Sequence, residues 1–268
     1  MTEYTPMMQH YLKTHEEYKD CILFYRLGDF YEMFFDDAKV VSKELELTLT
    51  GKSCGAEERA PMCGIPYHAA ETYLTRLVKK GYKVAICEQV EDPKLAKGMV
   101  KREVTRVVTP GTTLNAQALD ETKNNYIMCI AYIGDHYGIS SADITTGDYY
   151  VTEVDSERKL LDEVNKYQPT EIICNEAFYI SGIDIDDMKN RMGIVIYSLD
   201  AWYFSDETAQ MTLKDHFKVR DLEGLGLADY DSGVVAAGAL LKYLYETQKS
   251  TLSNLVAILP DTPGTVLM

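Results

Sequence analysis

The stretch GDFYE, near the N-terminus, places an aromatic ring and a carboxylate two residues apart, at Phe30 and Glu32. Residues two apart in an extended chain point to the same side, so both side chains belong on one face of a strand. Period-two alternation cannot bury the ring and at the same time leave the carboxylate in water. One of the two therefore lies in an environment unusual for its type, and the pair is the first candidate site.

Two motifs that suggest nucleotide binding are incomplete. Residues 50–53, Thr-Gly-Lys-Ser, resemble the end of a P-loop, but that loop needs a glycine at position 46. Glu46 stands there instead, and its charged side chain would obstruct a phosphate. GLGLA at 224–228 is half of a dinucleotide-binding fingerprint, and no strand precedes it. We therefore predict no nucleotide site in this chain and interpret 224–228 as a loop between helices.

Metal-dependent chemistry has one candidate, Asp143, which ends a predicted strand before a hairpin. Nucleases of the RNase H type place a metal-binding aspartate on such a strand, together with carboxylates from later strands. The later strands here supply only Glu171. Cys63 and His68 could also be imagined as metal ligands, but they lack a second ligand pair, and we interpret His68 as structural. A nuclease centred on Asp143 remains an alternative, although no metal site is expected.

Charge is distributed unevenly along the 268 residues. The whole chain carries a formal net charge of -15, which argues against binding to nucleic acid phosphates. Residues 1–113, however, have a net charge of -1, and residues 114–268 have -14. From Arg76 to Arg106, nine basic residues stand against only four acidic ones. Any surface that binds an acidic ligand is therefore expected in the first half.

The first half alternates helices and strands, which predicts a mixed α/β domain over residues 1–113. Thr5 and Pro6 suit the N-cap and first turn of a helix, and Asp36 suits the N-cap of another. The segment 51–68 is rich in glycine and proline and is predicted as a long loop, which is typical of functional segments. The remaining elements are expected as strands at 21–27, 45–50, 82–89 and 103–110 and as a helix at 69–80.

The polar stretch 114–125 predicts a linker to a second domain at 126–250. Three strands with a hairpin turn at Gly147 open this domain, after which helices and strands alternate. This order predicts an α/β fold with a largely parallel sheet. The six cysteines lack a C-x-x-C motif and are expected as reduced thiols. We find no run of 18 apolar residues and no signal peptide, so an intracellular, cytoplasmic location is expected.

Five motifs carry a family resemblance: GDFYEMFFDDA, PMCGIPYHA, AICEQ, VTPGT and SADITTGDY. In this order they resemble the N-terminal part of MutS, the bacterial family that recognises DNA mismatches, through essentially all of residues 1–250. The resemblance implies a mismatch-binding domain followed by an RNase H-like connector domain that has lost catalysis. In the family, the phenylalanine wedges beside the mispaired base from the minor groove and the glutamate hydrogen-bonds that base. These roles fall on Phe30 and Glu32.

The physical properties of mismatches fit these roles. A mismatch stacks and pairs poorly, so an apolar wedge unstacks it more easily than a normal base step, and many different mispairs can be recognised. A carboxylate near phosphates is repelled, so Glu32 needs a specific hydrogen bond, and it must be protonated to donate one to a base acceptor. Backbone contacts are expected from six basic residues, whose alternative is a solvated surface. They are Lys52, Arg59, Arg76, Lys80, Arg102 and Arg106.

The resemblance also predicts what this chain does not do by itself. The family's lever, clamp and ATPase regions, with ATP, Mg²⁺ and the homodimer contacts, are expected outside it, so no cofactor and no enzymatic activity are assigned. The connector is expected to dock repair partners such as MutL, in a nucleoid-associated bacterial protein. Residues 251–268 are interpreted as the start of the core region or a tail. Weak, salt-sensitive DNA binding is expected without the clamp, and an acidic interaction scaffold is the other alternative.

Overall fold

The computed structural model describes residues 3–113 and 123–266, which fold into two compact units. Unit 1 comprises Met1–Asn115 and unit 2 comprises Ala116–Met268, and each has its own sheet. The predicted α/β fold in two domains is confirmed. Most of the predicted linker, residues 114–122, lies outside the described residues. No helix in the described part of the chain is long and apolar enough to cross a membrane.

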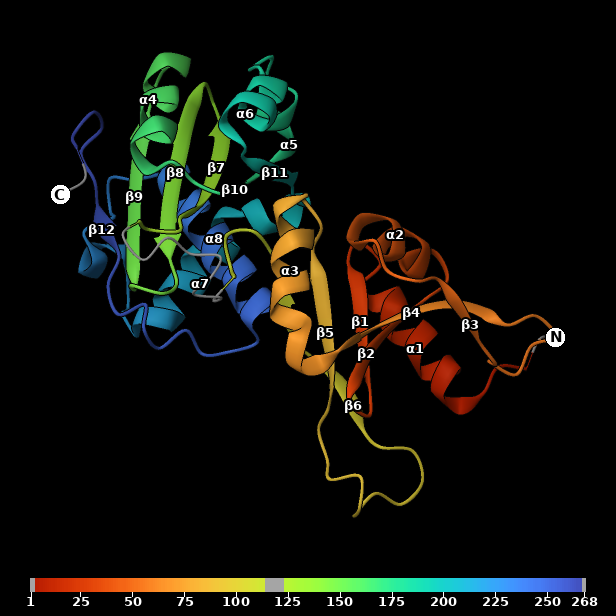
Figure 1. Ribbon diagram of the computed structural model, residues 1–268. Helices are drawn as coiled ribbons and strands as arrows, with labels where there is room; N and C mark the ends of the chain where they lie inside the picture. The colour runs from red at the N-terminus through yellow and green to blue at the C-terminus, as the bar shows by residue number, and fades with distance from the viewer. Residues whose placement is uncertain (1–2, 114–122, 267–268) are drawn as a thin grey trace. The chain divides into compact units, whose positions relative to one another are not determined.

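Unit 1 is built on a six-stranded sheet in the order β3-β4-β2-β1-β5-β6 (Figure 1). Neighbouring strands are antiparallel except β1 and β5, which are parallel. The connection between β5 and β6, residues 90–101, extends away from the sheet. The strands are β1 (Ile22–Leu27), β2 (Phe30–Phe34), β3 (Thr50–Lys52), β4 (Ala60–Pro66), β5 (Val84–Gln89) and β6 (Arg102–Val108).

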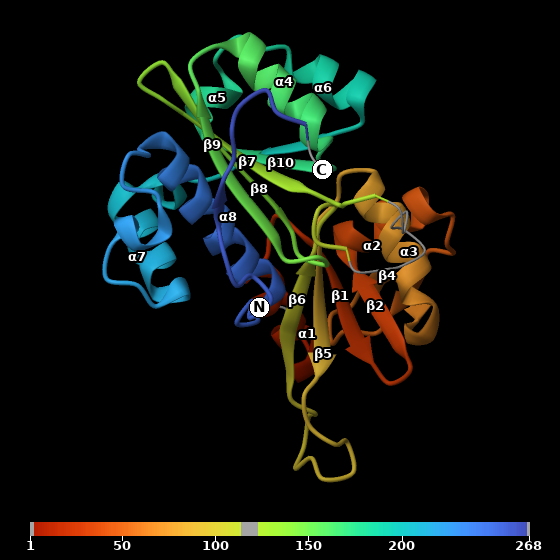
Figure 2. The same ribbon diagram turned by 90° about the vertical axis from the view of Figure 1, so that its left-hand side faces the viewer.

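Helices cover the two faces of this sheet unequally. On one face, α1 packs Met8 and Tyr11 against strand residues that include Tyr25 and Phe34. On the other face, α2 and α3 lie side by side (Figure 2) and pack against a separate apolar cluster. One face is therefore covered by a single helix and the other by two. The helices are α1 (Pro6–Glu17), α2 (Phe35–Leu45), the 3-10 turn η1 (Tyr67–Ala69) and α3 (Ala70–Lys79).

The predicted start of the first helix is confirmed, whereas that of the second is not. Thr5 Oγ1 accepts a hydrogen bond from the Met8 backbone N–H at 3.3 Å. The N-cap of α2 is Phe34, which makes no side-chain capping bond. Asp36 is not the cap because the chain turns one residue earlier, at Phe35, whose φ is +55°. Asp36 instead lies in the first helical turn, where a negative charge is favourable.

Two other element predictions for unit 1 are wrong. The strand predicted at 45–50 does not form, because α2 continues to Leu45 and Glu46 ends it in a left-handed conformation, and only Thr50 of this range belongs to a strand, β3. The segment 51–68 is not one long loop, because it contains all of β4. Its glycines and prolines suggested a loop, but Cys63 and Ile65 alternate as buried residues and β4 pairs with β2 along its length. Tertiary pairing overrides the local preference here.

A two-residue turn, Gly28–Asp29, joins β1 to β2 and positions the first candidate site. Leu27 pairs with Phe30 directly across this turn. Gly28 has a φ of +61°, which residues with a side chain rarely adopt, and two-residue hairpins require such a position. Phe30 is thereby placed at the first position of β2, at one end of the sheet.

Unit 2 contains a second six-stranded sheet, in the order β11-β10-β7-β8-β9-β12. Three of its pairings are parallel and two are antiparallel, so the parallel strands expected of it are combined with an antiparallel meander. Gly147 lies in the turn between β8 and β9 with a φ of +83°, as predicted. The strands are β7 (Ile127–Ile133), β8 (His136–Asp143), β9 (Asp148–Val154), β10 (Glu171–Cys174), β11 (Val195–Ser198) and β12 (Leu259–Pro260).

Helices cover both faces of this second sheet. α7 and α8 pack on one face and α4, α5 and α6 on the other, which gives three layers (Figure 2). The predicted loop at 224–228 lies between α7 and α8. The helices are α4 (Glu157–Tyr167), α5 (Glu176–Tyr179), α6 (Ile185–Met192), η2 (Ala201–Phe204), α7 (Asp206–Phe217), η3 (Leu222–Leu225) and α8 (Ser232–Gln248).

The described residues after α8 pack back onto unit 2. Leu252, Leu255 and Ile258 are buried in the core that α7 and α8 share with the sheet. The short strand β12 pairs with β9, and Lys166 Nζ lies 2.5 Å from Asp261 Oδ2. This part of the segment 251–268 therefore contributes to the packing of unit 2.

Candidate nucleic-acid interface

Phe30 and Glu32 lie on the face of the unit 1 sheet that α1 covers only in part. Phe34, two residues further along the same face, is buried against Tyr11, whose ring centroid is 4.9 Å away. Phe30 lies beyond this contact and is 46% exposed, without an aromatic partner among residues 3–113. Both members of the pair therefore lie in environments unusual for their types, the ring because it is exposed and the carboxylate because it is largely enclosed.

Glu32 forms an ion pair with Lys52, which comes from the neighbouring part of the sheet. Lys52 Nζ donates to Glu32 Oε2 at 2.8 Å. The carboxylate side chain is 15% exposed and the lysine side chain 35%, so the pair is only partly hydrated. Its interaction is consequently screened less than that of a surface pair. The candidate site thus presents an apolar ring next to a carboxylate whose charge is compensated.

Gly64, on β4, lies opposite Glu32 and close to both members of the pair. A Cβ atom at Gly64 would lie 3.7 Å from Phe30 Cδ1 and 3.8 Å from Glu32 Cγ. These are ordinary van der Waals distances, so a side chain there would fit but would occupy the space between the ring and the carboxylate. The glycine keeps that space open on the sheet face.

Two of the six predicted backbone-contact residues share this sheet face with Phe30. One is Lys52, through its pair with Glu32. The other is Arg102, whose guanidinium carbon lies 5.3 Å from the Tyr25 ring centroid and whose Nε donates to the Arg26 carbonyl oxygen at 2.7 Å. Arg59 is exposed just before β4 and donates from its guanidinium to the Gly51 carbonyl oxygen at 2.6 Å.

The other three basic residues are not brought to this face. Arg76 and Lys80 belong to α3 and the residue after it, and α3 packs against the opposite face of the sheet. Lys80 Nζ is also paired with Glu44 at 2.9 Å. Arg106 pairs with Ile86, whose side chain belongs to the core under α2 and α3. The structure therefore divides the predicted set between two faces.

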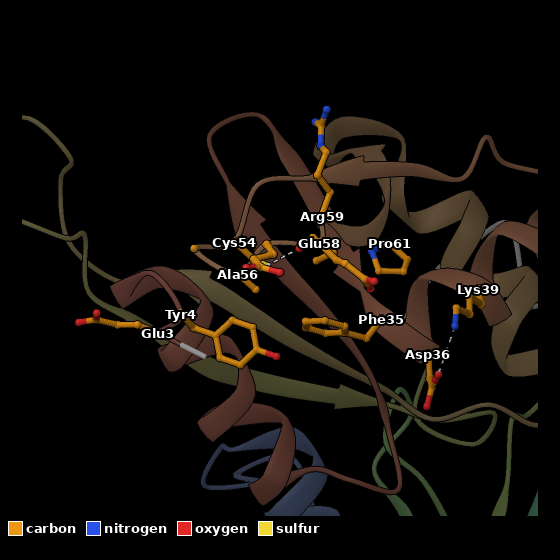
Figure 3. A pocket seen from close by; sticks show the side chains of 13 residues that line it. Glu3, Tyr4, Phe35, Asp36, Lys39, Cys54, Ala56, Glu58, Arg59 and Pro61 are labelled. Atoms are coloured by element: carbon orange, nitrogen blue, oxygen red, sulfur yellow. Dashed lines mark hydrogen bonds and ion pairs between the residues drawn. The ribbon is translucent and has the colours of Figure 1, made fainter. Parts of the chain in front are cut away.

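A cavity of about 830 Å³ lies beside the N-terminal segment of unit 1 (Figure 3). The rings of Tyr4 and Phe35 meet edge to face in it, with centroids 6.3 Å apart. Four carboxylate residues line it, which disfavours phosphate groups. They are Glu3, Asp36, Glu57 and Glu58. We therefore do not assign this cavity to DNA.

The carboxylates of unit 2 that suggested a nuclease are engaged in structural hydrogen bonds. Buried Asp143 accepts from the backbone N–H groups of Asn125 and Thr145 at 3.0 and 2.9 Å. Glu171 is also buried and accepts from Tyr243 Oη at 2.6 Å. Over residues 3–113 and 123–266, no group of three or more His, Cys, Asp or Glu side chains could hold a metal ion. We therefore assign no metal to Asp143.

Cys63 and His68 do not form a ligand pair. The Cys63 thiol is buried beside the Ala38 carbonyl oxygen, and burial raises its pKa to about 11. His68 is exposed in the turn after β4. All six cysteines are free and buried, as expected for reduced thiols.

The P-loop-like residues 50–53 do not fit a nucleotide phosphate. Thr50, Gly51 and Lys52 form strand β3, and no helix follows them to offer its N-terminus to an anion. Lys52 is instead paired with Glu32. We therefore assign no ATP binding to this segment.

The Lys52–Glu32 pair does not follow from the sequence pattern, although both residues are candidates in it. It depends on the order β3-β4-β2, in which Lys52 stands opposite Ala60 and Glu32 opposite Gly64. The pair could be predicted from the sequence if residues 60–66 were recognised as a strand. The glycine and prolines of that strand make it look like a loop instead.

Comparison with known proteins gives a consistent result for both units. Residues 5–117 match the family model for MutS domain I, and residues 125–256 match that for MutS domain II. A DNA mismatch repair protein MutS from Lachnoclostridium phytofermentans is 66% identical over 260 residues, which cover 97% of this chain and 28% of that relative. The corresponding proteins of Ruminiclostridium cellulolyticum and Acetivibrio thermocellus are 54% and 50% identical, over 94% and 95% of this chain. The chain spans less than a third of the length of these relatives.

Proposed function

Because the chain belongs to the MutS family of DNA mismatch repair proteins, we propose that its first unit recognises mispaired bases through Phe30 and Glu32. The observation that carries the proposal is the half-exposed Phe30 ring beside the compensated Glu32–Lys52 pair, on the partly uncovered sheet face. An exposed aromatic ring with no aromatic partner in the described part of its unit is suited to stacking on a base.

The ring acts as a wedge at a weak point of the duplex. Inserting an apolar side chain between base steps costs a few kcal/mol of stacking for a normal pair. A mispaired step has already lost part of that stacking and pairing, so the same insertion costs less. Discrimination arises from this difference in deformation energy, and the wedge itself needs no base-specific contact.

Glu32 supplies the polar contact of the site, and Lys52 compensates its negative charge near the DNA phosphates. An unpaired carboxylate would repel the phosphates that line both edges of the minor groove. Lys52 compensates that charge while a duplex approaches, since its ammonium lies 2.8 Å from the carboxylate. Glu32 can then hydrogen-bond the displaced base, either by accepting from a base N–H or by donating once protonated.

The contribution of unit 2 and of the longer relatives is also a proposal. We assign unit 2 the role of connector, which joins the recognition unit to the rest of a MutS protein and docks repair partners such as MutL. ATP, Mg²⁺ and homodimer contacts are assigned to regions that this chain does not match, and no enzymatic step is assigned to the chain itself. The relatives are bacterial repair proteins, so we place the protein on nucleoid DNA.

The test uses a chimera in which this chain replaces the matching 260 residues of the L. phytofermentans relative. Fluorescence anisotropy compares its binding to duplexes with and without one mispair, in the presence and absence of Mg²⁺. The proposal expects a preference for the mispaired duplex that Phe30→Ala removes, and intact DNA throughout. A Phe30→Ala chimera that keeps the preference contradicts the wedge. Cleaved DNA would favour a nuclease, and no DNA binding would favour an interaction scaffold.

A further inference from the structure

Arg26 lies in a polar cluster on the sheet face opposite Phe30, directly behind the turn that carries it. Its side chain is only 17% exposed, and its Nε donates to the Gly28 carbonyl oxygen at 2.5 Å. A guanidinium nitrogen also donates to Glu88 Oε2, on β5, at 3.2 Å. Arg26 therefore ties the hairpin turn to a second strand of the sheet.

Tyr67 holds the same turn from the β4 side. The Arg26 guanidinium lies over its ring at 3.8 Å from the centroid, which is close for a cation–π contact. The backbone N–H of Tyr67 donates to the Asp29 carbonyl oxygen at 2.8 Å. Both residues of the turn, Gly28 and Asp29, are thus hydrogen-bonded to the pair formed by Arg26 and Tyr67.

Glu88 closes the cluster by joining Arg26 to Tyr31, the residue after Phe30. The Tyr31 hydroxyl donates to the second carboxylate oxygen of Glu88. Burial raises the pKa of Glu88, while the neighbouring Arg26 guanidinium lowers it. The positive charge of Arg26 therefore helps to keep this partly buried carboxylate ionised.

These contacts matter for Phe30 because its own ring cannot fix its position. A ring that is 46% exposed and has no aromatic partner among the described residues of unit 1 gains little packing energy from one orientation. The residues on either side of it are held instead, Asp29 by Tyr67 and Tyr31 by the core and Glu88. A wedge held in place before binding loses less conformational freedom when it inserts.

We propose that Arg26, stacked on Tyr67, is a positioning residue that holds the Gly28–Asp29 turn so that Phe30 is presented in one fixed orientation. The proposal rests on the wedge function of Phe30 for its biological meaning. Its physical content, a rigid turn, can be measured without DNA. A merely structural Arg26 would contribute to stability without changing the environment of the Phe30 ring.

The test labels Phe30 as 4-fluorophenylalanine in this chain and records its ¹⁹F resonance. We expect one narrow line for the native residues, and a line broadened or split by Arg26→Lys, because lysine keeps the charge but loses the planar stack and the fork of donors. Arg191→Lys is the matched control, since Arg191 forms a bidentate pair with Asp187 in unit 2. It is expected to leave the line unchanged.

A second pair of variants keeps the test decisive if Arg26→Lys does not fold. Tyr67 is half-exposed, so its ring can be altered at the surface. Tyr67→Phe keeps the aromatic ring under Arg26 and is expected to preserve the narrow line. Tyr67→Leu removes that ring and is expected to broaden the line as Arg26→Lys does. A narrow line in folded Arg26→Lys or Tyr67→Leu protein, as judged by circular dichroism, overturns the proposal.

Binding by the chimera separates this proposal from the wedge itself. If both hold, Arg26→Lys lowers the preference for a mispaired duplex by roughly fivefold, about the value of one cation–π contact. If the ¹⁹F line broadens while Phe30→Ala leaves the preference unchanged, Arg26 positions a residue that is not the wedge. If Arg26→Lys broadens the line but leaves the preference for a mispaired duplex unchanged, while Phe30→Ala removes that preference, Arg26 holds the turn without contributing to recognition. That result overturns the proposed role of Arg26 in presenting the wedge.

Discussion

Phe30 in unit 1 and Trp202 in unit 2 are aromatic residues of nearly equal exposure, at 46% and 48%, but their surroundings differ. The Trp202 ring stacks on Tyr203 with centroids 4.2 Å apart, and Lys242 Nζ lies 4.0 Å from its centroid. Phe30 has no ring partner in the described part of its unit, and its neighbours are a glycine and an ion pair. Trp202 is satisfied by protein contacts, whereas Phe30 is left available for another molecule.

The same contrast extends to the two sheets. In unit 2, helices cover both faces, and the carboxylates of Asp143 and Glu171 are buried among hydrogen-bond donors. In unit 1, a single helix leaves one end of a face open, and the Glu32 carboxylate there is compensated by the Lys52 ammonium. Both sheets have six strands, but the sheet of unit 1 carries an exposed aromatic ring beside a carboxylate whose charge is compensated.

The largest effect is expected from removing each of the two aromatic rings in turn. In the chimera, Phe30→Ala is expected to reduce the preference for a mispaired duplex tenfold or more, as about 1.4 kcal/mol or more of differential insertion energy is lost. Trp202→Ala, the matched exposed aromatic, is expected to leave the preference unchanged. Anisotropy titrations with paired and mispaired duplexes provide the ratio. Equal effects of the two substitutions would show that exposure alone, and not the Phe30 site, matters.

Removing the charge of Glu32 is expected to have a smaller effect than removing the Phe30 ring, and to strengthen the binding of fully paired DNA. Glu32→Gln leaves Lys52 uncompensated, so fully paired duplex should bind roughly fivefold more tightly through one additional phosphate contact. The preference for a mispair falls accordingly. Glu176→Gln, at an exposed acidic position of unit 2, serves as the charge-matched control. Weaker binding of paired duplex by Glu32→Gln would be inconsistent with charge compensation by Lys52.

The two faces of the unit 1 sheet can be distinguished by salt dependence. Substituting Arg102, which shares the sheet face with Phe30, with Met is expected to reduce the magnitude of the negative slope of log K against log salt by about one, because one phosphate contact is lost. Arg76→Met, on the helix that covers the opposite face, is expected to leave the slope unchanged. Titrations between low and physiological salt measure both slopes. A reduced slope for Arg76→Met would mean that DNA also contacts the α3 side.

The smallest difference is expected in the cores, where the two units are alike. Burial raises the pKa of Cys87 in unit 1 and of Cys174 in unit 2 to about 12 in each case. Since the thiolate is the reactive form, a raised pKa means that very little of it is present at pH 8. Native protein at pH 8 should therefore react only slowly with a thiol reagent, and all six cysteines should react after unfolding in denaturant. Rapid labelling of one thiol in native protein would show that its core opens.

The sequence is sufficient to predict the two-unit α/β fold and to place Phe30 and Glu32 on one face of a strand, because element patterns and period-two alternation are local properties. The sequence does not predict features that depend on how strands distant in the chain pair with one another. Strand β4 is hidden by its glycines and prolines, and the Lys52–Glu32 pair depends on that strand. The basic run that ends at Arg106 likewise gives no information on which face of the sheet each residue occupies.

Photo-crosslinking can identify the residue that touches the mispaired base. A duplex carrying 5-iododeoxyuridine opposite guanine is bound to the chimera and irradiated, and mass spectrometry locates the crosslinked residue. We predict a crosslink at Phe30 that disappears when the iodinated base is correctly paired with adenine. A crosslink of equal yield in both duplexes, or one located in unit 2 in place of Phe30, would contradict the assignment of Phe30 as the mismatch wedge.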